Sequence, residues 1–151
     1  MRLRLIWPGK TRDARLRALS DEYLNRLSHF ARPEVTELKE TPGTKAGIGW
    51  DSKRISDRLS SGAVTVLMDP NGVQLSSEEM AAKVSSWENS GTKEVVFIVG
   101  GPNGVPLELS SIVTQRWSLS RLTLTHEMAR VVLLEQLYRA YTIIHGLPYQ
   151  K

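Results

Sequence analysis

An apolar run without polar alternation, EVVFIV at residues 94–99, constrains the fold more than any other stretch of this sequence. A strand of that composition is buried on both faces, which is typical of a central strand in a parallel sheet. Parallel strands need crossover connections, and these connections place helices over the sheet. The run therefore predicts an α/β fold with helices on both sides of a mostly parallel sheet.

The segments before this run alternate between strand and helix patterns, as such a fold requires. Arginine and leucine alternate over residues 2–5, which indicates a short strand. Further strands are predicted at 34–40 and 63–68, the second of them ended by a DPNG turn at 69–72. The glycine-rich stretch 41–50 is interpreted as a mobile loop.

Three amphipathic helices are predicted between these strands and after them. The first has apolar residues at helical spacing, namely Leu16, Leu19, Tyr23, Leu27 and Phe30. The second turns Ile55 and Leu59 inward and has Gly62 at its C-cap. The third starts with a capping box of Ser76 and Glu79, and its buried face carries Met80, Val84 and Trp87.

Length and composition limit the class of protein. With 151 residues, 40% hydrophobic and 24% charged, the chain can form one domain with a real core, and we expect 1–151 to be a single domain. The lack of cysteine excludes a disulfide scaffold and a thiolate nucleophile, and three scattered histidines predict no metal site. No secretory or membrane-spanning pattern occurs, so we expect a cytoplasmic protein without a membrane partner. The net charge of +4 suits an RNA partner, although many basic proteins bind no polyanion.

Two glycines, a proline, an asparagine and a third glycine follow the apolar run, at residues 100–104. Asn-Gly is a strong hairpin signal, but Pro106 weakens the case for a second strand. In open α/β sheets, ligands bind beyond the carboxyl ends of strands, where glycine lets the main chain come close. The residues alone leave a plain turn and a ligand site equally open. The stretch matches neither a P-loop nor the dinucleotide fingerprint.

The last long pattern begins as an extended segment and continues as a helix from a Thr125 cap to about residue 144. Arg130 lies on its apolar side in line with His126, and a buried arginine needs a partner. One interpretation is a salt bridge of Arg130 with Glu127 or Asp69. The other, favoured by the pairing of the two side chains, is that His126 and Arg130 face a polar ligand at the helix N-terminus. The polar side of this helix carries Glu135, Gln136, Arg139 and Thr142.

Two further features concern the end of the chain. The last helix is apolar over most of its circumference, which is more than one sheet face would need to cover, and this predicts a homodimer. The tail that follows it contains Tyr149 and Lys151, and it is placed to close over a site near the helix.

Several motifs in this order closely resemble the ribosomal RNA large subunit methyltransferase H (RlmH) family. They are VGGPNG, WSLSRLTLTHEMARVVLLEQLYRAYTI and GLPYQK, and LRLIWPGK and LMDPNG…LSSEEMA fit the same pattern. The resemblance implies a SPOUT-type fold with a C-terminal trefoil knot. It also implies a homodimer that transfers a methyl group from S-adenosyl-L-methionine (SAM) to N3 of pseudouridine 1915 in helix 69 of 23S rRNA, on assembled 70S ribosomes.

The same resemblance implies which residues form the site. The cofactor pocket should contain Met68, Gly100, Gly101, Ser120, Arg121, Leu122, Thr123, Leu124 and Thr125. The bare glycines would then let the cofactor lie against main chain. SAM brings the reactive methyl group, so the protein must supply orientation and help remove the N3 proton. The candidates for this work are His126, Arg130 and Tyr149, with their individual roles left open.

Two positions depart from the family pattern. Thr125 replaces the usual proline, which should leave cofactor binding intact, whereas Gln150 replaces the usual histidine and puts that histidine in doubt as an essential base. Two alternatives stay open: a SPOUT methyltransferase for another RNA, and an inactive module that binds RNA or the ribosome. The retained glycine pair and SLSRLTLTH loop argue against the inactive module. Because phosphate contacts alone are unselective, we expect 70S particles to be a much better substrate than naked 23S rRNA.

Overall fold

The computed structural model describes residues 1–40 and 52–149. In chain order its elements are β1 Arg2–Pro8, α1 Ala14–Leu27, β2 Arg32–Leu38, α2 Ser52–Ser56, β3 Val64–Gln74, α3 Ser77–Asn89, β4 Glu94–Val99, the 3₁₀ helix η1 Leu107–Ser111, β5 Gln115–Ser118 and α4 His126–Ile144. The expected loop at 41–50 lies outside the described residues, as do Gln150 and Lys151.

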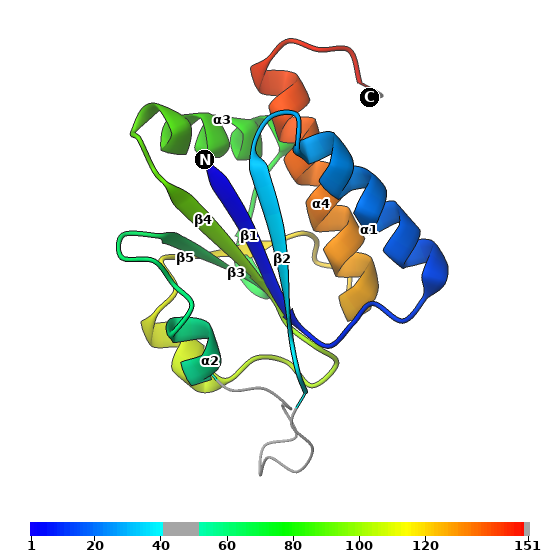
Figure 1. Ribbon diagram of the computed structural model, residues 1–151, viewed down its shortest axis with the longest axis vertical. Coiled ribbons are helices and arrows are strands. Elements are labelled where there is room, and N and C mark those ends of the chain that lie inside the picture. Colours follow the sequence, from blue (N-terminus) through cyan, green and yellow to red (C-terminus); the bar gives the residue numbers. More distant parts are fainter. Residues whose placement is uncertain (41–51, 150–151) are drawn as a thin grey trace.

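The strands form one sheet in the order β2-β1-β4-β3-β5, and each neighbouring pair is parallel (Figure 1). β4 is the middle strand, and all of its residues are buried. Its side chains alternate between two cores: Val95, Phe97 and Val99 belong to one, and Val96 and Ile98 belong to the other. The predicted α/β fold with a central parallel strand is therefore confirmed.

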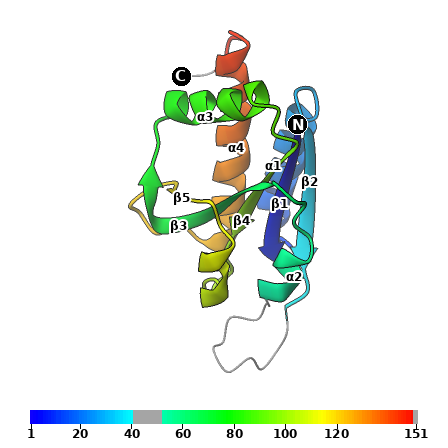
Figure 2. The same ribbon diagram turned by 90° about the vertical axis from the view of Figure 1, so that its left-hand side faces the viewer.

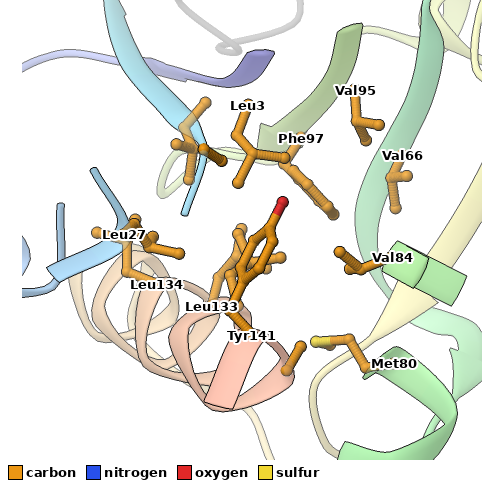
Figure 3. Packing of buried hydrophobic residues seen from close by; sticks show 14 of the residues in the cluster. Leu3, Leu27, Val66, Met80, Val84, Val95, Phe97, Leu133, Leu134 and Tyr141 are labelled. Carbon is orange, nitrogen blue, oxygen red and sulfur yellow. The ribbon is translucent and has the colours of Figure 1, made fainter. Parts of the chain in front are cut away.

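Helices cover both faces of this sheet. The larger core lies beneath α1, α3 and α4, where Val84 and Leu133 join Phe97 in one cluster (Figure 3). The smaller core is covered by α2 and η1 through Ile55 and Leu109. Figure 2, turned from the view of Figure 1, shows α2 on the opposite side of the sheet from α4. This layering positions the first turn of α4 at the edge where the strands end.

Helix starts follow local signals in the sequence. Ser76 and Glu79 form the predicted capping box of α3: Glu79 N donates to Ser76 Oγ (3.1 Å), and Ser76 N donates to Glu79 Oε2 (2.7 Å). Thr125 caps α4 as predicted, accepting from Met128 N at 3.3 Å. Asp13 caps α1 in the same way, through two amide groups of the first turn.

The DPNG segment at 69–72 does not end its strand, contrary to the sequence prediction. β3 continues to Gln74, and both Met68 and Val73 are paired with Trp117 of β5. The residues between them therefore form an irregularity in the ladder rather than a turn between elements. The glycine in this segment approaches β5 closely, because a Cβ there would lie 2.7 Å from the main chain of that strand.

The structure also differs from the sequence prediction in one helix end and in the placement of two side chains. α2 ends at Ser56, and Gly62 (φ +78°) lies instead in the turn before β3. Leu19 is 41% exposed, because α1 turns Ser20 rather than Leu19 toward the core. Thr142, expected on the polar side of α4, is buried because α4 packs between α1 and α3.

This position of α4 also changes the argument for a homodimer. Contacts with α1, α3 and the sheet cover most of its apolar circumference within one chain. Its exposed large apolar residues are Met128 and Ile143, at opposite ends of the helix. The width of the apolar face is therefore explained without a second copy, and the dimer needs other support.

Candidate active site

A cavity of about 630 Å³ opens at the irregularity in β3 and at the ends of β4 and β5. This volume is in the range of small-molecule sites, and the carboxyl edge of a parallel sheet is where such sites occur. The irregular part of β3 after Met68, the turn after β4, and the loop from β5 to α4 form its walls. The lining residues are Met68, Asp69, Pro70, Val99, Gly100, Gly101, Pro102, Gly104, Val105, Leu119, Ser120, Leu122, Thr123, Leu124, Thr125, His126 and Ala129.

Most residues expected to bind a cofactor line this cavity. Arg121 is exposed and does not line it, whereas the others do: Met68, Gly100, Gly101, Ser120, Leu122, Thr123, Leu124 and Thr125. Sequence reasoning missed several lining residues. Asp69 and Val99 carried a usable signal, since each stands next to an expected residue at the end of a strand. Val105 and Ala129 carried none, because they reach the cavity from the far side of a turn and from inside a helix.

The glycines after β4 form a tight turn without a hairpin. Gly104 N donates to Gly101 O at 3.1 Å, and Gly104 has a φ of +87° that favours glycine. The chain then enters η1 instead of a second antiparallel strand. A Cβ on Gly101 would lie 2.7 Å from Pro8 Cγ at the end of β1. The close approach of β1 is thus one reason for a bare residue at 101, and Gly101 also lines the cavity, as the family resemblance implied.

The loop from β5 to α4 is held by its own serines. Ser118 Oγ donates to Ser120 O (2.9 Å), and Leu122 N donates to Ser120 Oγ (3.0 Å). In the part of the chain that the structure describes, the main-chain N–H groups of Thr123 and Leu124 donate no hydrogen bond. Both residues line the cavity, so these unpaired main-chain donors lie near any ligand in it, beside apolar side chains.

His126 begins α4 and lines the cavity. Its side chain is 29% exposed, and its Nε2 lies 3.8 Å from Glu127 Oε2. Burial, followed by the nearby positive charge of Arg130, lowers the pKa of His126. The imidazole is therefore neutral at neutral pH and able to accept a proton.

Arg130 is fully buried and does not line the cavity. Its Nη2 donates to the Pro8 carbonyl (2.7 Å), and its Nη1 donates to Thr11 Oγ1 (3.1 Å) and to the Gly9 carbonyl (3.4 Å). The guanidinium also lies over the Trp7 ring, 4.9 Å from its centroid. Arg130 thus ties the end of β1 and the residues after it to α4.

Both sequence interpretations of Arg130 need correction. Glu127 Oε1 accepts instead from the main-chain N–H groups of Arg12 (2.8 Å) and Asp13 (3.0 Å), and Asp69 pairs with a different arginine. Within residues 1–40 and 52–149, Arg130 forms no ion pair, and of the two expected side chains only the histidine lines the cavity. The actual partners are carbonyls and a hydroxyl more than 100 positions away, which leave no pattern in a sequence.

Tyr149 lies at the other end of α4 from His126, and α4 spans about 28 Å at 1.5 Å per residue. Its hydroxyl is 3.3 Å from that of Tyr23, and its ring centroid is 4.9 Å from that of Tyr138. The Arg139 guanidinium lies 4.6 Å from its ring centroid. Burial, together with the Tyr23 hydrogen bond, raises the pKa of Tyr149. One chain therefore does not bring this tyrosine to the cavity.

The described residues contain neither a metal cluster nor a membrane-spanning helix. Among residues 1–40 and 52–149, no group of three or more histidine, aspartate or glutamate side chains is arranged to hold a metal ion. No helix in these ranges is both long and apolar enough to cross a membrane.

The family described as "Predicted SPOUT methyltransferase" matches residues 1–150. A probable methylase family protein from Haemophilus influenzae has a similar fold, with a TM-score of 0.54 and 10% sequence identity over 95% of this chain. This chain spans 66% of the length of that protein. Together with a cavity at the carboxyl edge of a parallel sheet, these matches define the class as SPOUT methyltransferases.

Relatives of nearly the same length are named ribosomal RNA large subunit methyltransferase H. The protein from Sorangium cellulosum is 40% identical over 149 residues, which cover 99% of each chain. The protein from Koribacter versatilis is 40% identical over 150 residues, 99% of this chain and 97% of its own. The protein from Desulfotalea psychrophila is 37% identical over 153 residues, 100% of both chains. The chain belongs to this family.

Proposed function

We propose that this protein transfers the methyl group of SAM to N3 of pseudouridine 1915 in helix 69 of 23S rRNA, on assembled 70S ribosomes in the cytoplasm. Membership of the family supports a methyltransferase that acts on large-subunit rRNA. The observation that carries the proposal is the cavity built from the glycine turn and the loop at 119–125. We propose that the whole chain, 1–151, acts as one SPOUT methyltransferase domain with the family's trefoil knot.

The residues of the cavity fit SAM. Its volume of about 630 Å³ suits a nucleoside that carries an amino acid. Leu119, Leu122 and Leu124 offer apolar surface to an adenine ring, and the free N–H groups of Thr123 and Leu124 offer donors to its nitrogen atoms. Gly100 and Gly101 also line the cavity and carry no side chain that would separate a ligand from their main chain. When bound, SAM supplies an electrophilic methyl group, so no protein nucleophile is needed.

The protein's own contribution is then to orient the base and to accept its N3 proton. We assign proton acceptance to His126, because it lines the cavity and its lowered pKa keeps it neutral. Arg130 contributes by holding the residues after β1 in place rather than by touching the substrate. Thr125 caps α4 with its side-chain hydroxyl, whereas the proline usual at this position has no side-chain acceptor. Tyr149 is assigned to contact the target base, since its raised pKa makes it a poor base.

These assignments require a homodimer. His126 and Tyr149 lie at opposite ends of α4 in one chain, so a site that uses both needs the tail of a second copy. We therefore propose that the tail acts across the dimer. The exposed Met128, Ile143 and Leu147 provide apolar surface for such an interface.

Mass mapping of 23S rRNA from cells with and without the gene tests the proposal. The expected result is a methylated pseudouridine in helix 69 that disappears with the gene and returns with the wild-type chain. A methyl group lost from another RNA would favour the first alternative, a different substrate. If the RNA is unchanged and the purified protein does not bind SAM in a calorimetric titration, the second alternative, an inactive binding module, holds.

A further inference from the structure

The loop between β1 and α1, residues 9–13, carries two unpaired basic side chains. Lys10 and Arg12 are exposed, and within the described residues neither side chain forms a hydrogen bond or an ion pair. By contrast, the next cation, Arg15, is paired with Asp13 at 2.9 Å. Lys10 and Arg12 are therefore the side chains at this corner whose charge is available to a partner.

Two residues of α4 fix the backbone of this loop. Glu127 accepts from the N–H groups of Arg12 (2.8 Å) and of its neighbour, and Arg130 donates to the Gly9 carbonyl (3.4 Å) and to Thr11 Oγ1 (3.1 Å). Because a carboxylate already occupies the amide groups ahead of α1, an external anion would meet the side chains of the loop and not its main chain. A backbone fixed before binding also lowers the entropy lost on binding.

The loop borders the candidate site on two sides. Pro8, directly before it, packs against Gly101 of the cavity, as the 2.7 Å approach of a Cβ there shows. The Arg12 amide is bonded to Glu127, which follows the cavity residue His126. The carboxylates of Glu40 and Glu127 lie beside this loop. They reduce its positive charge without cancelling it, because three cations, Lys10, Arg12 and the buried Arg130, stand against these two carboxylates.

We propose that Lys10 and Arg12 form a phosphate-binding platform that holds the backbone of the RNA substrate beside the methyl-transfer site. The identity of that RNA rests on the proposed function. Guanidinium and ammonium groups bind phosphate oxygens directly, and such contacts position a nucleic acid without reading its sequence. The cavity then selects the target base, while the platform sets the distance between the RNA backbone and the cavity.

The test is a Lys10→Gln/Arg12→Gln double variant, which removes both charges and keeps long polar side chains. Binding to 70S particles is measured by filter retention over a series of salt concentrations, and methyl transfer to the same particles is measured in parallel. We expect Kd and KM for the particles to rise about tenfold, and the slope of log Kd against log salt to shrink by about the value of two phosphate contacts. SAM affinity should not change. The charge-preserving Lys10→Arg/Arg12→Lys variant should bind like the wild type.

The matched control removes two other positive charges, which lie at the amino ends of the strands, far from the loop after β1. Arg32 begins β2 and Lys93 directly precedes β4; both are exposed and have no side-chain partner in the described chain. The Arg32→Gln/Lys93→Gln variant should therefore bind 70S particles like the wild type.

Several results would overturn the platform. One is a test variant that binds as tightly as the control, and another is a wild type that does not bind 70S particles at all. Weaker binding with an unchanged salt slope would assign the loop to a protein surface of the particle. Weaker SAM binding would instead assign Lys10 and Arg12 to the cavity that binds SAM. If the wild type binds with the expected dependence on Lys10 and Arg12 but transfers no methyl group, the proposed function fails and the platform stands.

Discussion

At the scale of single residues, Arg130 is the side chain whose position differs most from what its sequence context suggests. It is a buried cation whose partners are carbonyl groups, a hydroxyl and an indole ring rather than a carboxylate. Its removal leaves buried acceptors without donors, and a buried hydrogen-bonding group left unpaired costs about 1–3 kcal/mol. Arg130 is thus expected to matter for stability and for the shape of the cavity wall.

Arg130→Met should lower the free energy of unfolding by about 2–4 kcal/mol, because it leaves several buried acceptors unpaired. It should also weaken SAM binding, since the end of β1 would no longer be held against Gly101. Urea unfolding and calorimetry measure the two effects. Arg139→Met is the control on the same helix: its pair with Glu135 is partly exposed, and we expect a loss of at most about 1 kcal/mol. Equal losses in the two variants would contradict the role given to Arg130.

His126 carries a prediction about pH. A base acts only when it is deprotonated, and the pKa of His126 lies below its ordinary value of 6.5. The single-turnover methylation rate should therefore be constant near neutral pH and fall on acidification, with a midpoint below 6.5. His126→Asn should be slow and should lack this acidic limb. If the limb persists in His126→Asn, another group accepts the proton.

At the scale of elements, the glycine turn after β4 and the end of β1 have to fit each other. Gly101→Ala should weaken both the fold and SAM binding, because the new Cβ would lie 2.7 Å from Pro8 Cγ. Pro8→Ala removes that Cγ and leaves a nearest side-chain atom at 3.8 Å, so the double variant should recover much of the loss. Thermal unfolding and SAM titration of the four proteins in this cycle check the coupling. Additive losses would show that Gly101 is needed for a different reason.

The sequence predicted elements well wherever the signal was local. The capping box of Ser76 and Glu79 and the buried run of β4 each need only neighbouring residues, and both predictions are confirmed. Predictions were wrong where a distant partner decides the outcome. The DPNG segment became an irregularity because β5 pairs with β3 on both sides of it, and Arg130 found carbonyls on β1. The family resemblance supplied the cavity residues, which local patterns alone left undecided.

At the scale of the whole molecule, the separation of His126 and Tyr149 makes the proposed dimer testable by mixing inactive chains. His126→Ala and Tyr149→Ala should each be nearly inactive as pure proteins. If the tail acts across the dimer, a co-expressed random mixture should regain about a quarter of wild-type activity, because half of the dimers are mixed and each has one intact site. A tail that acts on its own chain would give no recovery, and a monomer in sedimentation would refute the dimer itself. Tyr149→Ala should bind SAM within a few-fold of wild type in either case.

The substrate preference also belongs to this scale. We expect a chain with a net charge of +4 to bind naked RNA weakly and unselectively. We therefore expect much faster methylation of 70S particles than of protein-free 23S rRNA under the same salt conditions. Equal rates on the two substrates would contradict recognition by shape and leave the RNA sequence as the determinant.

The parallel sheet has a consequence for how the chain folds during synthesis. The middle strand β4 and its neighbour β1 pair Arg2 with Glu94, positions about 90 residues apart in the chain. Contacts of such separation form late, because a long loop must close before any of them is gained. Until β4 has left the ribosome, one hydrogen-bonding edge of β1 has no partner strand, and an unpaired strand edge exposes the nascent chain to aggregation. The sheet of this enzyme, which is proposed to modify ribosomes, can thus form only once a ribosome has reached the last third of the chain.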